Sequence, residues 1–262
     1  MPVVIITGAS KGLGRALGTA LAGRGWDLVV DARSQGPLEE TARVLRAAGT
    51  RVVALPGDVA DAGHRAALIA AARELGGLDL LVNNASVLGD APLVRLADHS
   101  LDGLRAALEV NVVAPLGLVQ EALPLLRASA YRAGQGTGDG SADESADESA
   151  DGPGREEASG GGAVLNLSSD AAVEAYPTWG GYGSSKAALD QLSAVLAVEE
   201  PWLRVWWVDP GDMRTDLYQA AVPAEDASAR PLPGTVVPAL LGLLDTWAAS
   251  GRYSAPALLG GA

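Results

Sequence analysis

Val3-Val4-Ile5-Ile6-Thr7-Gly8-Ala9-Ser10-Lys11-Gly12-Leu13-Gly14 carries the strongest structural signal in the chain: four β-branched apolar residues lead directly into a glycine-rich turn. Residues 12–24, which overlap the end of this stretch, have a helical pattern. A strand-to-helix turn uses glycines for its tight backbone and for close approach of a pyrophosphate, whose charge is met by free N–H groups at the helix N-terminus. We therefore predict a dinucleotide site formed by Gly8, Ser10, Lys11, Gly12, Leu13 and Gly14. A turn without a ligand is the alternative.

Short apolar runs alternate with longer helical patterns along the rest of the chain. We expect strands at 3–7, 28–31, 52–55, 78–83, 163–168 and 205–208, and helices at 12–24, 37–48, 63–75, 101–128 and 181–199. Strands that are apolar on both faces and alternate with helices predict an α/β fold, a parallel sheet with helices on both faces. We expect a single domain over residues 1–262, with ligands bound beyond the carboxyl ends of the strands.

Composition excludes several classes of function. The 262 residues, 48% of them hydrophobic, suffice for one sizeable core. The chain has no cysteines, and its two histidines, His64 and His99, lie far apart, so we expect neither disulfides nor a metal site. A net charge of −13 argues against a nucleic-acid partner, which requires clustered Lys and Arg. The apolar N-terminus is too short to span a membrane and lacks signal-peptide features, so we expect a cytoplasmic protein without membrane contact.

Residues 133–162 differ in kind from the rest. The segment repeats Ser-Ala-Asp-Glu at 141–144 and 145–148, and eight acids oppose two arginines between Arg132 and Glu157. Such a composition cannot bury enough surface to offset chain entropy, so we predict a disordered acidic insertion within the domain. A tail that binds a basic partner is the alternative. Because the preceding helix runs antiparallel to the strands, we expect the insertion at the sheet edge opposite the cofactor.

The spacing Thr-Gly-x-x-x-Gly-x-Gly from Thr7 to Gly14 resembles that of the short-chain dehydrogenase/reductase family. Asn83-Asn84-Ala85-Ser86 is similar to the family's Asn-Asn-Ala-Gly element, and Asp58-Val59 to its Asp-hydrophobic pair beside the adenine ring. The resemblance covers almost the whole chain and implies a Rossmann-type doubly wound parallel sheet. It also implies that Asn84 supports the sheet and lines the adenosine side. Ser86 departs from the pattern by replacing a glycine, and a solvated turn residue is the alternative for Asp58.

The end of the second predicted strand bears on the choice of nicotinamide cofactor. There, an acid would bind the ribose 2′-OH and an arginine would accept a 2′-phosphate. Alignment on the family pattern puts Ala32 at the acidic position and Arg33 at the basic one, and Lys11 resembles the second cation of NADP-preferring members. Two cations favour NADP(H). NAD(H) stays open as the alternative, because a shift of one residue would make Asp31 a ribose ligand.

Tyr182 and Lys186 are spaced i, i+4 at the start of a predicted helix, which places both side chains on one face. A free phenol has a pKa of about 10, and a neighbouring ammonium lowers that pKa by favouring the phenolate. We therefore expect Tyr182 to protonate a carbonyl oxygen or deprotonate an alcohol. Seen alone, the pair can also arise by chance.

Ser169 stands thirteen positions before Tyr182, which is the family's Ser-to-Tyr spacing. The resemblance implies that Ser169 holds the substrate oxygen, and Ser168 is the competing candidate. Asn111 resembles the family's helix asparagine, which holds a water that relays protons toward the lysine; a capping or buried amide is the alternative. The implied catalytic residues are Asn111, Ser169, Tyr182 and Lys186.

The segment from Asp209 to Asp216 is similar to the family's Pro-Gly-x-x-x-Thr element, which covers the nicotinamide. The resemblance adds Pro210, Gly211 and Thr215 to the cofactor-binding residues, together with Tyr182 and Lys186. Thr215 would then hydrogen-bond the carboxamide. Residues 217–233 have little secondary-structure signal and are predicted to form a substrate lid, with Trp179 as a wall of the substrate site.

These features indicate an oxidoreductase that transfers a hydride between NADP(H) and a small carbonyl or alcohol substrate. A non-catalytic, dinucleotide-sensing regulator on the same fold is the alternative, and it predicts loss of Tyr182 or Lys186, both of which are present. An epimerase or dehydratase is less favoured, because such relatives usually carry a larger C-terminal substrate domain. The family resemblance also implies a homo-oligomer.

Overall fold

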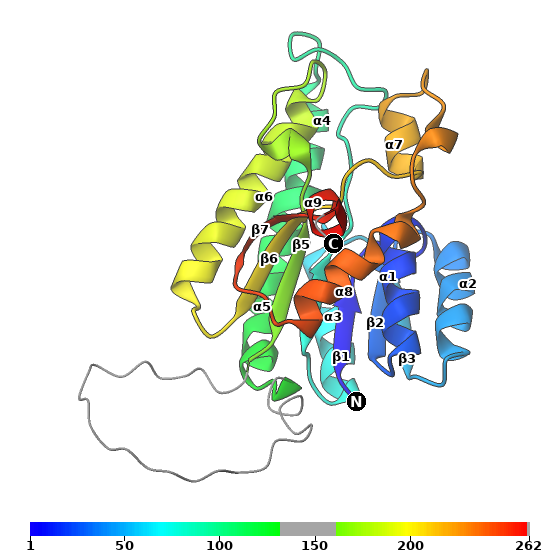
Figure 1. Ribbon diagram of the computed structural model, residues 1–262, viewed down its shortest axis with the longest axis vertical. Helices are drawn as coiled ribbons and strands as arrows, with labels where there is room; N and C mark the ends of the chain where they lie inside the picture. The colour runs from blue at the N-terminus through cyan, green and yellow to red at the C-terminus, as the bar shows by residue number, and fades with distance from the viewer. Residues whose placement is uncertain (132–160, 261–262) are drawn as a thin grey trace, which may run out of the picture.

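The computed structural model describes residues 1–131 and 161–260. Within them, seven parallel strands form one sheet in the order β3-β2-β1-β4-β5-β6-β7 (Figure 1). The strand order reverses between β1 and β4, which creates the crevice where ligands of such sheets bind. The strands are β1 (Val3–Ile6), β2 (Asp27–Ala32), β3 (Val52–Pro56), β4 (Leu80–Asn83), β5 (Ala163–Leu167), β6 (Arg204–Asp209) and β7 (Gly251–Ser254).

Strand β1 shows why the sheet is covered on both faces. Val4 and Ile6 belong to one buried cluster, and Val3 and Ile5 belong to another, because successive side chains of a strand point to opposite faces. The first cluster is covered by α1 (Gly12–Gly23), α2 (Gln35–Arg46) and α8 (Val237–Asp245), and the second by α3 (Ala62–Leu75), α5 (Ala114–Arg127) and α6 (Gly180–Glu199). The predicted α/β fold class, a Rossmann-type doubly wound parallel sheet, is confirmed.

Several elements differ from the expected ones. The helix expected over 101–128 is divided into α4 (Leu101–Leu108), a π-helical turn (Glu109–Val113) and α5. The predicted lid contains α7 (Asp216–Ala221), which lies beyond the carboxyl ends of the strands, near the top of Figure 1. Strand β7 was not predicted because its sequence, Gly-Arg-Tyr-Ser, has no apolar run and is only partly buried at the sheet edge. The remaining elements are α9 (Ala255–Gly260) and short 3-10 turns at Asp170–Ala172, Ala227–Ala229 and Pro233–Thr235.

One helical segment among the described residues, Leu101–Arg127, is long and apolar enough to cross a membrane by length and composition, with a mean hydropathy of 1.3. Its residues Leu118, Val119 and Leu126 are buried in the core against the sheet. Core helices meet the same criterion, so the segment is weak evidence for a membrane span.

The predicted acidic insertion at 133–162 lies outside the described residues except for Gly161 and Gly162. These two glycines belong to the fold, because both are buried and the Gly162 N–H donates to the Leu126 carbonyl at 2.8 Å. The expected disorder therefore does not extend to these two residues. Gly161 and Gly162 lead directly into β5, so this end of the segment joins the sheet at the edge where the strands begin, opposite their carboxyl ends.

Candidate active site

The turn after β1 is shaped by contacts with the end of β4. Gly8 has a φ of +66°, in the left-handed region that glycine adopts without steric cost. The Asn84 amide donates to the carbonyl oxygens of Thr7, at 2.7 Å, and Gly8, at 3.1 Å. The Thr7 hydroxyl oxygen in turn accepts from the backbone N–H groups of Asn84 and Ala85, each at 3.0 Å. Asn84 therefore joins the two strands that flank the crevice.

The N-terminus of α1 faces this turn. Its N-cap residue, Lys11, makes no side-chain capping bond, and the first N–H groups of a helix have no intrahelical acceptor. They are suited to a pyrophosphate. Gly14 has a packing role instead, because a Cβ there would lie 2.5 Å from Asn84 Nδ2 and 2.8 Å from the Gly8 oxygen. The third glycine thus lets helix and strand approach behind the turn.

A cleft of about 350 Å³ runs from this turn across the carboxyl ends of the strands. Of the residues predicted to bind the cofactor, Gly14 and Gly211 are not part of its lining. Asp31 and Ala32 also border the cleft. The predicted residues that do line it are Gly8, Ser10, Lys11, Gly12, Leu13, Arg33, Asp58, Val59, Asn84, Tyr182, Lys186, Pro210 and Thr215.

The two predicted cations differ in their surroundings. Lys11 Nζ lies 2.6 Å from Asp216 Oδ2, and both side chains are largely exposed. An exposed pair of this kind contributes about 0–1 kcal/mol, so Lys11 can readily change partners. Arg33 is exposed at the cleft, and within residues 1–131 and 161–260 it takes part in no ion pair.

Helix α6 brings Tyr182 and Lys186 together, as their i, i+4 spacing predicts. Their exposed fractions are 7% and 2%. Lys186 Nζ donates to the Leu167 carbonyl at 2.7 Å and lies 5.5 Å from the centre of the Tyr182 ring. The end of β5 thus holds the ammonium beside the phenol.

Burial, rather than the neighbouring charge, dominates the protonation of this pair. It raises the pKa of Tyr182 to about 12, against a lowering effect of a hydrogen bond with Ser86. It lowers the pKa of Lys186 to about 8, against a raising effect of Asp190. The expected lowering of the phenol pKa is therefore not found, because loss of hydration and the charges of Asp170 and Asp209 raise that pKa. Tyr182 is protonated at neutral pH, which suits a proton donor.

The two serines at the end of β5 have different partners. The Ser168 hydroxyl is buried and donates to Asp190 Oδ1. The Ser169 hydroxyl donates to Asp170 Oδ1 at 3.0 Å. Both serines line a cavity shared with Tyr182. Arg252, on β7, links this group, since its guanidinium contacts Asp190 Oδ2 and donates to the Ser169 carbonyl, both at 2.9 Å. Asp190 and Arg252 were not predicted as site residues, because they come together only when β7 joins the sheet.

Asn111 lies in the π-helical turn and is fully buried. Its Nδ2 donates to the Val87 carbonyl and to Ser185 Oγ, both at 2.9 Å, and its Oδ1 accepts from the Val87 N–H at 2.9 Å. The Ser86 hydroxyl, at 3.1 Å, also donates to Oδ1. Asn111 therefore ties the loop after β4 to α6. It does not line the cleft or the cavity beside Ser169. Ser86 replaces a glycine without strain, because it is not among the described residues with positive φ.

A second cavity, of about 330 Å³, adjoins the cleft at Tyr182. Trp179, predicted as a wall of the substrate site, lines this cavity, and its ring packs edge-on at 5.8 Å from that of Tyr182. Gly211 also lines the cavity, with a φ of +73°. Thr215 borders both spaces, and its hydroxyl caps α7 by accepting from the Tyr218 N–H at 3.2 Å.

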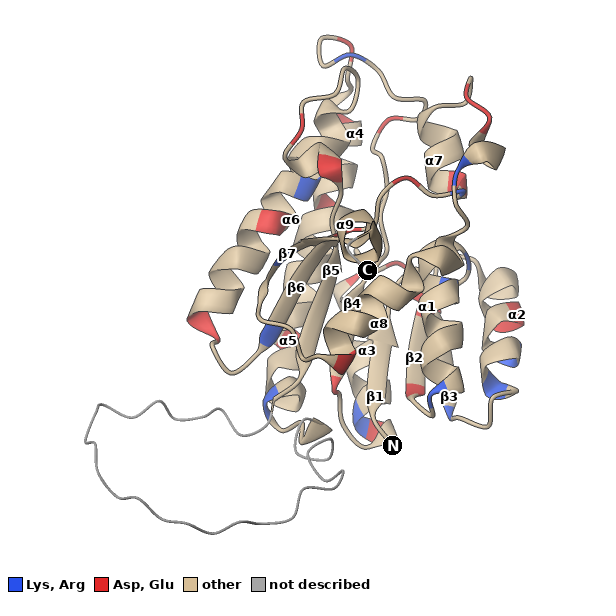
Figure 2. Ribbon diagram, in the orientation of Figure 1, with Lys and Arg blue, Asp and Glu red and all other residues tan. Residues whose placement is uncertain are grey.

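Carboxylates dominate the charge of this second cavity. Figure 2 shows acidic positions on the loops around α7. Burial raises the pKa values of Asp209 and Asp212. The cavity is lined by four acids and one base, namely Asp170, Asp209, Asp212, Glu225 and Arg230.

The glycine turn and the Tyr182–Lys186 pair are also found by comparison with a known protein family. The model of the short chain dehydrogenase family matches residues 2–137 and 155–226, which include the glycine turn and the Tyr182–Lys186 pair. The chain belongs to the short-chain dehydrogenase family. This short-chain dehydrogenase is 32% identical to sepiapterin reductase of Rattus norvegicus over 229 residues, which cover 84% of this chain and 77% of the rat protein.

Solved structures agree with this family membership. A putative short chain dehydrogenase from Pseudomonas syringae superposes with a TM-score of 0.79 at 26% identity, covering 97% of this chain and 93% of that one. A putative short chain dehydrogenase from Escherichia coli CFT073, solved in complex with NADPH, gives a TM-score of 0.79 at 25% identity, covering 97% and 96% of the two chains. The chain is thus a member of an oxidoreductase family.

Proposed function

We propose that this short-chain dehydrogenase reduces a small carbonyl compound with NADPH, or oxidises the matching alcohol with NADP⁺. The observation that carries the proposal is the position of Tyr182. Among the described residues that line both the cleft and the second cavity, it alone carries a titratable proton. A proton donor between a nucleotide site and a substrate site is what carbonyl reduction requires.

Two hydroxyl groups would act on the substrate oxygen. In the proposal, the Ser169 hydroxyl donates a hydrogen bond to the carbonyl oxygen and orients it. The Tyr182 phenol then gives its proton to the same oxygen as negative charge develops there. A bound nicotinamide would supply the hydride. The raised pKa of Tyr182, about 12, keeps the phenol protonated at neutral pH, as a proton donor to a carbonyl oxygen must be.

Lys186 and Asn111 have supporting roles in this proposal. The Lys186 ammonium, held by the Leu167 carbonyl, stabilises the negative charge left on the phenolate after proton transfer. Asn111 fixes the loop after β4 against α6, so its side chain acts as a positioning group. A water relay at Asn111 stays a prediction.

The preference for NADP(H) is supported by charge at the end of β2. Arg33 is exposed at the cleft without an ion-pair partner among the described residues, and Lys11 has only a weak surface pair with Asp216. Both can approach a 2′-phosphate, which guanidinium and ammonium groups bind well. The NADPH complex of the similar Escherichia coli protein supports the same choice. NAD(H) is the second cofactor to be tested.

The remaining parts of the proposal concern the setting of the enzyme. We propose a small neutral carbonyl or alcohol as the substrate, because the second cavity has about 330 Å³ and is lined mainly by carboxylates among its charged groups. We further propose a cytoplasmic homo-oligomer. Cell fractionation tests the location, and light scattering of the purified protein tests the assembly.

The deciding experiment is a screen of small carbonyl compounds with NADPH and NADH in parallel, with Tyr182→Phe as the matched blank. We expect oxidation of NADPH by the wild type and a loss of kcat of about 10³-fold in the variant, with NADPH affinity retained. Activity that persists in Tyr182→Phe would exclude the phenol as the proton donor. NADPH binding without turnover of any carbonyl would favour the dinucleotide-sensing regulator instead.

A further inference from the structure

The end of β2 carries an acid whose side chain is turned away from the solvent. We propose that His64 sets the preference for NADP(H) over NAD(H), by holding the Asp31 carboxylate away from the ribose position. This inference rests on the proposed function. It assigns a specificity role to a residue outside the motifs of the cofactor site.

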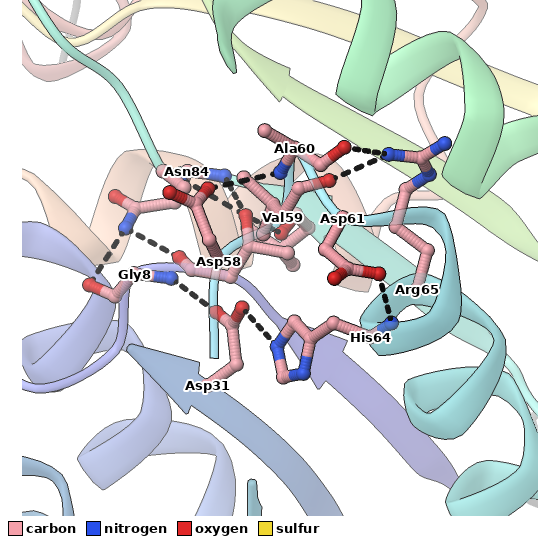
Figure 3. A network of polar contacts seen from close by, with 12 residues as sticks. Gly8, Asp31, Asp58, Val59, Ala60, Asp61, His64, Arg65 and Asn84 are labelled. Carbon is pink, nitrogen blue, oxygen red and sulfur yellow. Dashed lines mark hydrogen bonds and ion pairs between the residues drawn. The ribbon is translucent and has the colours of Figure 1, made fainter. Parts of the chain in front are cut away.

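Both oxygens of Asp31 are engaged (Figure 3). Oδ1 accepts from the Gly8 N–H at 2.7 Å, and Oδ2 lies 3.0 Å from His64 Nε2. Because a carboxylate only accepts hydrogen bonds, Nε2 carries the proton in this contact. The Asp31 side chain is 1% exposed and that of His64 is 10% exposed. The carboxylate is thus fixed between the glycine turn and α3.

The start of α3 places the imidazole ring. Asp61 caps this helix, with Oδ1 accepting from the N–H groups of Gly63, at 2.6 Å, and His64, at 3.2 Å. Residue 57, just after β3, must be small for the ring to reach Asp31, since a Cβ on Gly57 would lie 2.2 Å from His64 Nδ1. The ring therefore packs against the Gly57 backbone while its Nε2 points to the end of β2.

Asp31 lies close to where the 2′ group of the cofactor's ribose would bind, so its contact with His64 affects cofactor choice. Asp31 borders the cleft two residues before Arg33, which also lines it. An acid at the end of this strand would hydrogen-bond a ribose 2′-OH, whereas a cation accepts a 2′-phosphate. A carboxylate released toward the cleft would offer an acceptor to NAD(H) and repel the phosphate of NADP(H). While His64 binds the Asp31 carboxylate, Arg33 is the charged side chain at the end of β2 that is free to contact the 2′ group.

The test compares dissociation constants of NADPH and NADH, measured by fluorescence titration of the whole chain. For His64→Ala, we expect the preference for NADPH to fall about tenfold, which corresponds to about 1.4 kcal/mol. A loss of structural support alone would weaken the binding of both nucleotides equally and leave the ratio of their dissociation constants unchanged. The double variant Asp31→Asn with His64→Ala should recover the preference, because it has no carboxylate to release and keeps an acceptor for the Gly8 N–H.

His99→Ala is the matched control. His99 Nδ1 lies 3.1 Å from Asp90 Oδ2, so this substitution removes the other His–Asp pair of the described residues, and neither partner lines the cleft. Its NADPH-to-NADH ratio should match the wild type. Two results would overturn the inference and leave the proposed function standing. One is an unchanged NADPH-to-NADH affinity ratio in folded His64→Ala, and the other is a double variant that is as unselective as His64→Ala. Wild-type protein that binds neither nucleotide would overturn the proposed function as well.

Discussion

The nucleotide cleft and the second cavity meet at Tyr182 but are built in different ways. The nucleotide end of the cleft is formed by short motifs at the ends of β1 to β4 and by the first turn of α1, and its other end by residues of α6 and of the segments that follow β5 and β6. The second cavity is formed by side chains from distant segments, including Leu88, Trp179 and the loop that leads into α7. A shared sheet can thus support one site that depends on backbone geometry and another that depends on side chains brought together by the fold.

The two sites also differ in charge. The cleft mixes cations, such as Lys11 and Arg33, with acids, whereas the second cavity has four acids and Arg230. Arg230 is already paired with Asp212 and Glu225, at 3.2 Å in each case. The first site is therefore compatible with a phosphate-bearing ligand, and the second disfavours anions.

The largest expected effect distinguishes the two serines between these sites. Ser169→Ala should lower kcat by about 10²- to 10³-fold, because it removes a donor to the developing oxyanion. Ser168→Ala, the matched control, should keep most of the activity and lose about 1 kcal/mol of unfolding free energy, since its hydroxyl donates to Asp190. Steady-state kinetics and urea unfolding measure the two effects. The reverse pattern would show that Ser168 holds the substrate oxygen.

The next effect tests the dependence of the cleft on backbone geometry. Gly14→Val should weaken NADPH binding about a hundredfold, because its side chain would meet Asn84 Nδ2 and the Gly8 oxygen, and such overpacking costs about 1–3 kcal/mol. Isothermal titration calorimetry measures the affinity. Gly23→Val, at a position with nothing within 4 Å of an added Cβ, is the control and should bind normally. Equal affinity in both variants would contradict the close packing at the turn.

A pH profile of activity tests the role of the positive charge on Lys186, which lies beside Tyr182. The pKa of Lys186 is lowered from 10.5 to about 8, so its ammonium loses its charge as the pH rises through about 8. The kcat/KM for reduction should be level below that pH and fall about tenfold per unit above it. Tyr182, with a pKa of about 12, stays protonated throughout. In Lys186→Arg, whose guanidinium keeps its charge, the fall should vanish, and a fall at the same pH would assign it to another group.

The smallest expected effect concerns the carboxylates of the second cavity. Wild-type enzyme should prefer a neutral diketone, such as diacetyl, to anionic pyruvate, and Asp212→Asn should reduce that preference about threefold by removing one like charge. Ratios of kcat/KM measure the preference. Asp102→Asn serves as the control, because Asp102 is an exposed residue of α4 outside both linings. An unchanged preference in Asp212→Asn would mean that the substrate does not approach this carboxylate.

The sequence predicted the first site better than the second for a physical reason. Glycine positions, strand ends and the i, i+4 spacing of Tyr182 and Lys186 are local features, and each was visible in a few consecutive residues. Asp190 and Arg252 were missed, and Ser86 was noted only as a departure from the family pattern, since each gains its role from a partner far along the chain. Asp31 appeared as a candidate ribose ligand, and its contact with His64 became visible only in the fold.

By itself, the sequence determined the parallel α/β architecture and the glycine turn, because hydrophobic periodicity and glycine spacing act over short distances. The tertiary structure decided which partners the Ser168 and Ser169 hydroxyls bind, where the acids gather and how the Tyr182 and Lys186 pKa values shift. Those properties depend on burial and on contacts between remote segments. Loss of hydration at Tyr182, which raises its pKa to about 12, is set by everything packed around the ring and by no single stretch of residues.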